Sequence, residues 1–178
     1  ETVEAVLSGA GKVAEEVWAP ANLPGDAEGC TLENGVVRTP SVYKDAYKAW
    51  AEGGWSSVGA DPQWGGMGMP GIVHAAAMEA WQGACMSFSL APMLTGAAIS
   101  AIEAHGSVSL RETYLPKLAS GEWTGTMNLT EPQAGSDLST VATRAFADGD
   151  GYRIKGSKIF ITWGDQEFSE NIVHLVLA

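Results

Sequence analysis

The spacing of hydrophobic positions changes partway along the chain, from a helical repeat to an alternating one. Between residues 2 and 121 apolar side chains recur every three or four positions, and after residue 137 apolar and polar residues alternate. These periods are typical of amphipathic helices and half-buried strands. Their order predicts an α+β fold. We expect an N-terminal helical domain at residues 1–123, followed at residues 124–178 by the first strands of an antiparallel, barrel-like β-domain.

Four or five helices are predicted in the first part of the chain. We expect them at residues 2–18, 42–52, 72–88 and 94–104 and between Ser107 and Gly121. Pro20 should end the first helix, and residues 22–40 contain so many Gly, Pro and Asn residues that we expect an ordered surface loop. Ser41 is the expected N-cap of the second helix. Helices 72–88 and 94–104 are apolar on nearly every face and should form the centre of the bundle.

The second part of the chain predicts strands. They are expected at residues 125–130, 140–147, 152–156, 158–162 and 171–177. Pro132 removes a backbone donor and ends the first strand, and Asp148-Gly149-Asp150-Gly151 is typical of a hairpin turn. The final strand is strongly apolar and would leave an open sheet edge. We therefore expect that the chain is part of a longer protein or pairs with a second copy as a homo-oligomer.

Charge and composition exclude some classes of function. The chain has 21 acidic and 10 basic residues, a formal net charge of -11, which argues against binding to nucleic acid or to an anionic membrane. We find no apolar run long enough to span a membrane and expect a cytoplasmic protein. Cys30 and Cys85 are predicted to be free thiols. His74, His105 and His174 share no metal-ligand spacing, so we predict no metal site.

One glycine-rich segment matches a nucleotide-binding spacing by chance. Gly66-x-Gly68-x-x-Gly71 has the spacing of the dinucleotide fingerprint, but Asp-Pro-Gln-Trp precedes it in place of a buried strand. No acidic residue lies between Glu79 and Glu103 to meet a ribose hydroxyl. Both features are required, so we interpret the segment as a turn before a helix.

The most specific chemistry lies where the two patterns meet. Residues 129–137 read Leu-Thr-Glu-Pro-Gln-Ala-Gly-Ser-Asp and follow a predicted strand. A glycine beside a hydroxyl and a carboxylate suits a tight loop whose N–H groups face an anion such as a phosphate. The alternative is a turn stabilised only by its own side chains. Asp137 is expected to stabilise this loop rather than to act as an acid or base.

This segment resembles the first signature of the flavin-dependent acyl-CoA dehydrogenase family. Residues 156–164, Gly-Ser-Lys-Ile-Phe-Ile-Thr-Trp-Gly, resemble the family's next flavin-contacting strand, and residues 105–123 resemble the segment that leads into the signature. The ending, residues 165–178, resembles the large subclass that includes 3-methylmercaptopropionyl-CoA dehydrogenases.

The resemblance implies FAD as cofactor. It implies that Thr130 meets the pyrimidine edge of the flavin, that Gly135 and Ser136 meet the pyrophosphate, and that Thr162 points at flavin N5. Ser136 is also implied in contact with acyl-CoA. The remaining implied FAD contacts are Met127, Leu129, Phe160 and Ile161. The sequence departs from the family in three places: Met127 replaces an aromatic residue, Asn128 a small or apolar one, and Phe160 a common Trp.

The implied reaction is α,β-dehydrogenation of an acyl-CoA thioester, with electrons passed on to an electron-transferring flavoprotein. In the family a Glu from a C-terminal helical domain is the base, so we expect no catalytic base within residues 1–178 and no activity of this segment alone. Two alternatives remain open at this point. One is a flavin-dependent oxidase or monooxygenase of the same fold, and the other is a non-catalytic helical interaction module.

Overall fold

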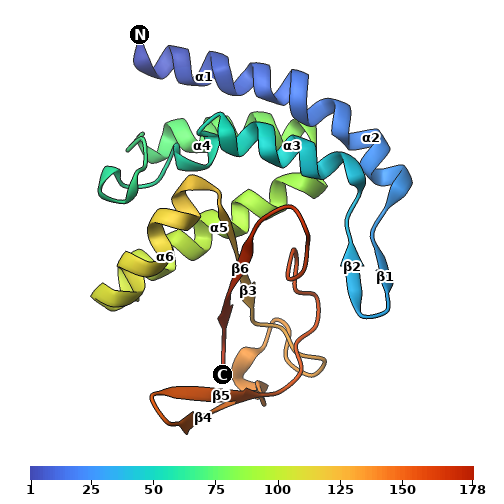
Figure 1. Ribbon diagram of the computed structural model, residues 1–178, viewed down its shortest axis with the longest axis vertical. Helices are drawn as coiled ribbons and strands as arrows, with labels where there is room; N and C mark the ends of the chain where they lie inside the picture. Colours follow the sequence, from blue (N-terminus) through green and yellow to red (C-terminus); the bar gives the residue numbers. More distant parts are fainter.

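The computed structural model describes all 178 residues, and its elements follow one another as helices first and strands second (Figure 1). The helices are α1 Thr2–Val13, α2 Ala19–Glu28, α3 Ser41–Glu52, α4 Gly71–Ala84, α5 Met86–His105 and α6 Val108–Ser120. The strands are β1 Thr31–Glu33, β2 Val36–Arg38, β3 Trp123–Asn128, β4 Arg144–Asp148, β5 Gly151–Lys155 and β6 Asn171–Val176. The predicted α+β order is confirmed, apart from the early hairpin β1–β2.

The prediction that Pro20 ends the first helix is wrong. A π-helical turn, Ala14–Trp18, joins α1 to α2, and the Ala19 amide bonds to the carbonyl of Ala14 five residues back. Pro20 then lies in the first turn of α2, directly after the π-helical turn. The widened turn lets one continuous rod pass a proline.

The prediction of a surface loop at residues 22–40 is also wrong in part. It contains the end of α2 and the antiparallel hairpin β1–β2, in which Thr31 pairs with Arg38. Asn34 and Gly35 form the turn with φ of +52° and +79°. Two positive φ values in succession match the right-handed twist of a tight hairpin, and Asn-Gly is the sequence best suited to them.

Aromatic side chains form the core of the helical part. Trp18, Trp81 and Phe88 are fully buried, and the Trp18 and Phe88 ring centroids lie 4.8 Å apart. Tyr43, Tyr47 and Trp50 share the buried face of α3, as predicted; Tyr43 stacks on Phe88 at 5.0 Å. The Trp81 indole donates to the Ala10 carbonyl at 3.1 Å and thereby ties α4 to α1.

Helix α5 lies at the centre, between α4, α6 and β3. The Gly125 amide of β3 donates to Oγ1 of Thr95 at 3.0 Å, and a Cβ at Gly125 would lie 2.5 Å from the Cβ of Ala98. A glycine is therefore needed where the strand crosses the helix. By length and hydropathy α5 would be sufficient to cross a membrane, contrary to our expectation from sequence. The core helix of a soluble protein meets the same criterion, and α5 buries Phe88, Ala98 and several neighbours.

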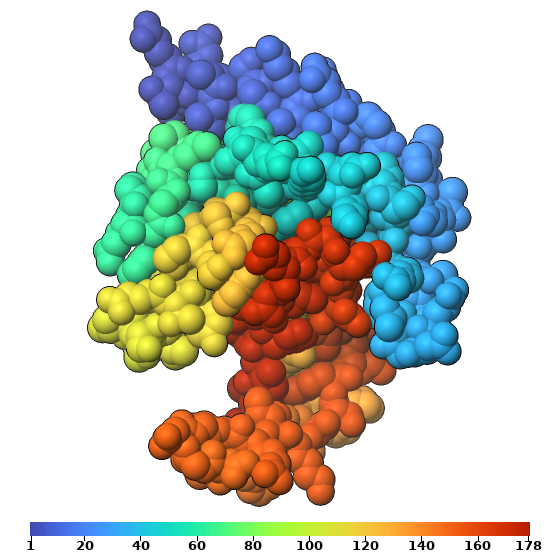
Figure 2. All heavy atoms as spheres, viewed as in Figure 1, coloured from blue at the N-terminus to red at the C-terminus, as the bar shows by residue number.

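The strands form three two-stranded sheets, and no closed barrel is present. β4 and β5 make the predicted antiparallel hairpin, which Figure 2 shows as a separate lobe below the rest of the molecule. β6 instead pairs in parallel with β3, Trp123 opposite Asn171. The strand predicted at 158–162 is a loop, and Phe160 within it has a positive φ of +59°, which lies outside the β region.

Candidate functional site

The structure brings together two segments that carry six of the eight predicted cofactor contacts, and Gly135 and Ser136 lie outside both segments. The Ile159 amide donates to the Thr130 carbonyl at 3.0 Å. The Lys158 ammonium donates to the Leu129 carbonyl at 3.0 Å, and the Thr126 hydroxyl donates to the Thr162 carbonyl at 2.8 Å. Residues 126–130 and 158–162 therefore lie side by side, although about 30 positions separate them in the sequence.

All eight predicted cofactor-binding residues reach the surface at least in part. Leu129, Gly135, Ser136, Phe160 and Thr162 are exposed, and Met127, Thr130 and Ile161 are half-buried. Phe160 is 82% exposed and has a φ of +59°. A positive φ is strained for a bulky residue, and such strain clusters at functional sites. An exposed aromatic ring in a strained loop fits a surface that packs against a flat ligand.

The free hydrogen-bonding groups of the predicted site residues are of the kinds that a flavin dinucleotide requires. The amides of Gly135 and Ser136 donate no hydrogen bond within the chain, and a Cβ at Gly135 would meet nothing within 4 Å. The side-chain hydroxyls of Thr130 and Thr162 likewise have no partner within the chain. Free amides in a turn suit a pyrophosphate, and hydroxyls suit the polar edge of a flavin ring. The residues present therefore fit FAD.

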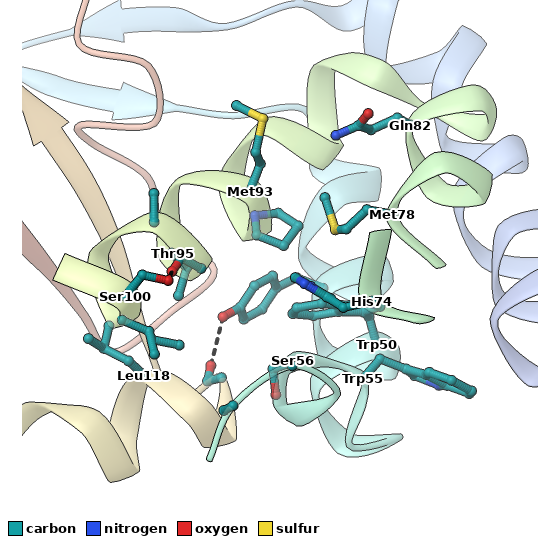
Figure 3. Close-up of a pocket in the computed structure, with 18 of the residues that line it drawn as sticks. Trp50, Trp55, Ser56, His74, Met78, Gln82, Met93, Thr95, Ser100 and Leu118 are labelled. Carbon is teal, nitrogen blue, oxygen red and sulfur yellow. Dashed lines mark hydrogen bonds between the residues drawn. The ribbon is translucent and has the colours of Figure 1, made fainter. Parts of the chain in front are cut away.

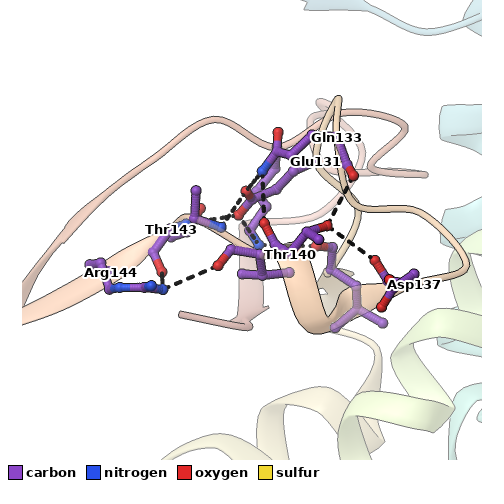
Figure 4. Close-up of polar contacts among 10 residues, drawn as sticks. Glu131, Gln133, Asp137, Thr140, Thr143 and Arg144 are labelled. Carbon is purple, nitrogen blue, oxygen red and sulfur yellow. Dashed lines mark hydrogen bonds and ion pairs between the residues drawn. The ribbon is translucent and has the colours of Figure 1, made fainter.

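Glu131 stabilises the loop at residues 129–137, called here the signature loop (Figure 4). Its carboxylate accepts from the amides of Ala142 and Thr143 at 2.8 and 3.0 Å, from Gln133 Nε2 at 2.5 Å and from Lys158 Nζ at 2.9 Å. Its backbone exchanges two hydrogen bonds with Ala134. Contacts with Thr143, the Ala142 amide and Lys158 hold the pKa of Glu131 well below its usual range.

Sequence reasoning missed the roles of Glu131 and Lys158. The sequence contains an acidic residue in the segment 129–137 and a lysine in the segment 156–164. Their spacing does not indicate that the two side chains form an ion pair. Asp137, by contrast, behaves as predicted: its Oδ1 accepts from the Ser139 amide at 2.9 Å and caps the short turn that follows. Hydrogen bonds from Ser139 lower the pKa of Asp137.

The depressed pKa of Glu131 predicts a pH dependence of stability. The stabilisation that its charged form provides is complete above the pKa of an unfolded glutamate, about 4.3, and is lost as the pH falls below it. Glu131→Gln should therefore lower the free energy of unfolding near neutral pH, and the difference from wild type should shrink as the pH is lowered to about 3. Urea unfolding between about pH 3 and pH 7 measures this difference in the free energy of unfolding.

Glu112→Gln, at an exposed position of α6, is the control. A difference between wild type and Glu131→Gln that stays constant with pH would contradict the lowered pKa of Glu131.

A cavity of about 610 Å³ lies beside the paired segments. Asn128, Lys158, Ile161, Thr162 and His174 contribute to its wall. Nδ1 of His174 lies 3.1 Å from Oδ1 of Asn128, so this asparagine, one of the departures from the family pattern, pairs across the parallel strands β3 and β6. Asn128 and His174 thereby fix one side of the cavity.

A second cavity, of about 270 Å³, lies between α3, α4 and α5 and is drawn in Figure 3. Trp50, Met78 and Met93 supply much of its apolar lining. At its edge the Tyr47 hydroxyl donates to the Gly121 carbonyl at 2.8 Å, and burial raises the pKa of Tyr47. Desolvation lowers the pKa of His74, which also lines this cavity. The two cavities share no lining residue.

Comparison with known proteins assigns the chain to a family. The family model "Acyl-CoA dehydrogenase, N-terminal domain" matches residues 4–122, and "Acyl-CoA dehydrogenase, middle domain" matches residues 126–174. A 3-methylmercaptopropionyl-CoA dehydrogenase of Ruegeria pomeroyi is 50% identical over 179 residues, and a butyryl-CoA dehydrogenase of Syntrophomonas wolfei is 42% identical over 183. Each match covers the whole chain but 30% of the relative.

The fold has solved counterparts in the same family. The crystal structure of an acyl-CoA dehydrogenase from Geobacillus kaustophilus matches 98% of this chain and 42% of its own, with a TM-score of 0.79 and 24% identity. FAD is the cofactor of this family. The chain thus spans about 30% of the length of the curated relatives that it matches, and it belongs to the acyl-CoA dehydrogenase family.

Proposed function

We propose that the protein containing this chain is an FAD-dependent acyl-CoA dehydrogenase that introduces an α,β double bond into an acyl-CoA thioester. The observation that carries the proposal is the contact between residues 126–130 and 158–162, which brings six of the eight predicted cofactor-binding residues into neighbouring segments. The two curated relatives described above are named for acyl-CoA dehydrogenation, of 3-methylmercaptopropionyl-CoA and of butyryl-CoA.

In this proposal each part of the surface binds a different part of FAD. The Gly135 and Ser136 amides bind the pyrophosphate, Thr130 binds the pyrimidine edge, and the Thr162 hydroxyl lies toward N5. Met127, Leu129, Phe160 and Ile161 pack against the ring, and Ser136 also contacts acyl-CoA. Bound FAD supplies the acceptor for the hydride that leaves the β carbon. Fixed donors around the ring favour this chemistry because they are oriented before the reaction begins.

We propose that the base that removes the α proton lies outside residues 1–178. Glu131 is 3% exposed and its carboxylate is occupied by four donors. Asp137 caps a turn. A general base needs a free oxygen within reach of the substrate and a pKa near the working pH, so the geometry of these two acids suits a structural role. An electron-transferring flavoprotein as electron acceptor, a homo-oligomeric assembly and a cytoplasmic location remain predictions.

Anaerobic mixing of the full-length protein with acyl-CoA tests the proposal. We expect the visible absorbance of oxidised flavin to be bleached and an α,β-unsaturated acyl-CoA to form in equal amount. Residues 1–178 alone should form no such product, and production of one would overturn the placement of the base. A full-length protein that binds no flavin would overturn the proposed function. Rapid reoxidation of the reduced flavin by oxygen would instead indicate an oxidase or monooxygenase.

A further inference from the structure

Glu131 and Lys158 form a buried ion pair between the two segments of the candidate flavin surface. Lys158 Nζ lies 2.9 Å from Oε1 of Glu131, and 10% of the Lys158 side chain and 2% of the Glu131 side chain are exposed. Glu131 is the one charged residue among the 37 buried residues. Removing two charges from water is costly, so such a pair adds little to stability compared with apolar residues of similar size. A role in fixing geometry is the better account of it.

Both members of the pair also bond to backbone atoms. Glu131 bonds to the amides of Ala142 and Thr143, and its backbone closes the turn that ends at Ala134, directly before Gly135. Lys158 also bonds to the Leu129 carbonyl at 3.0 Å. The next amide, that of Ile159, bonds to the Thr130 carbonyl. The ion pair therefore sets how Thr130 and the loop beginning at Phe160 lie relative to each other.

We infer that the Glu131–Lys158 pair is a positioning device that holds Thr130 and residues 160–162 at the spacing a bound flavin requires. This inference rests on the proposed function. Both residues act through the backbone that they hold, and neither is a catalytic residue. Misplacement of binding groups by a fraction of an ångström weakens a preorganised site, so loss of the pair should change flavin affinity and the environment of the flavin ring while the helical core stays intact.

Lys158→Met in the full-length protein tests this inference. Methionine keeps most of the length of the side chain and removes the charge, and Glu131 retains three of its four donors, so the variant should fold. We expect the Kd for FAD to rise about tenfold and the visible circular dichroism of the bound flavin to change. Lys158→Arg restores the cation and should recover binding to within about threefold of wild type.

Lys117→Met is the matched control. Lys117 pairs with Glu122 outside the two segments, so its loss should leave FAD binding at the wild-type level. Wild-type affinity and an unchanged flavin spectrum in Lys158→Met would overturn the inference. So would a Lys158→Met protein that fails to fold by far-ultraviolet circular dichroism, or a Lys158→Arg protein that binds no better than Lys158→Met. A wild-type protein that binds no FAD would instead refute the proposed function itself.

Discussion

Replacing Gly135 with aspartate is expected to raise the Kd for FAD about 100-fold in the full-length protein, because a carboxylate would stand where the pyrophosphate is proposed to bind. Like charges in close contact cost several kcal/mol, and about 2.7 kcal/mol corresponds to 100-fold. The substitution should not disturb the fold, since Gly135 is exposed and a Cβ there meets no atom within 4 Å. Titration of the apoprotein with FAD, followed by flavin fluorescence, measures the effect.

Gly151→Asp provides the control for this prediction. Gly151 begins β5, is exposed, and also has no atom within 4 Å of an added Cβ. It lies in the β4–β5 hairpin, outside the loop at residues 129–137, so the same added charge should change the Kd by no more than about twofold. Equal effects of the two substitutions on the Kd would show that the net charge of the protein, rather than the position of the added carboxylate, weakens FAD binding. Wild-type FAD binding by Gly135→Asp would show that the loop at residues 129–137 does not contact the pyrophosphate.

Phe88→Ala is expected to lower the free energy of unfolding by about 3–5 kcal/mol, the range for truncating a buried phenylalanine. Phe88 is fully buried and has ring neighbours from three parts of the chain: Trp18 in the π-helical turn, Tyr43 in α3 and Phe168 in the loop before β6. A cavity at this position would weaken the packing of α5 against the helices and against the loop after Phe160. Urea unfolding followed by tryptophan fluorescence measures the change.

Phe146→Ala is the comparison for the core substitution. Phe146 is 54% exposed on the β4–β5 hairpin, so its loss should change the free energy of unfolding by no more than about 0.5 kcal/mol. A loss below about 1 kcal/mol for Phe88→Ala would mean that the aromatic cluster relaxes into the vacated space. Such a result would contradict the view that this cluster organises the helical half.

Local signals predicted most of the helical half. Ser107 caps α6 by accepting the Leu110 amide at 3.3 Å, and Gly121 ends the helix with a φ of +79°, both as the sequence indicated. The helix end predicted at Pro20 was wrong because a π-helical turn directly before it allows the helix to continue. Hydrophobic periodicity does not indicate such a turn. The hairpin β1–β2 could have been predicted from the Asn34-Gly35 dipeptide, which is typical of a tight hairpin turn.

Contacts between segments far apart in the sequence could not be predicted from local patterns. The parallel contact of β6 with β3 depends on a connection of more than 40 residues, and register over such a distance has no local signature. The candidate site residues came from resemblance to a family, whereas the Glu131–Lys158 contact joins residues 27 positions apart. The domain boundary between residues 123 and 124 remains a prediction.

The proposed function requires that the loop at Thr130 to Ser136 and the loop at Phe160 to Thr162 form a single flavin-binding surface. A crystal structure of the full-length protein with FAD tests it most directly. We predict the pyrophosphate within hydrogen-bonding distance of the Gly135 and Ser136 amides, and the isoalloxazine ring between the hydroxyls of Thr130 and Thr162. A flavin bound elsewhere, with these amides and hydroxyls facing only solvent, would contradict the account.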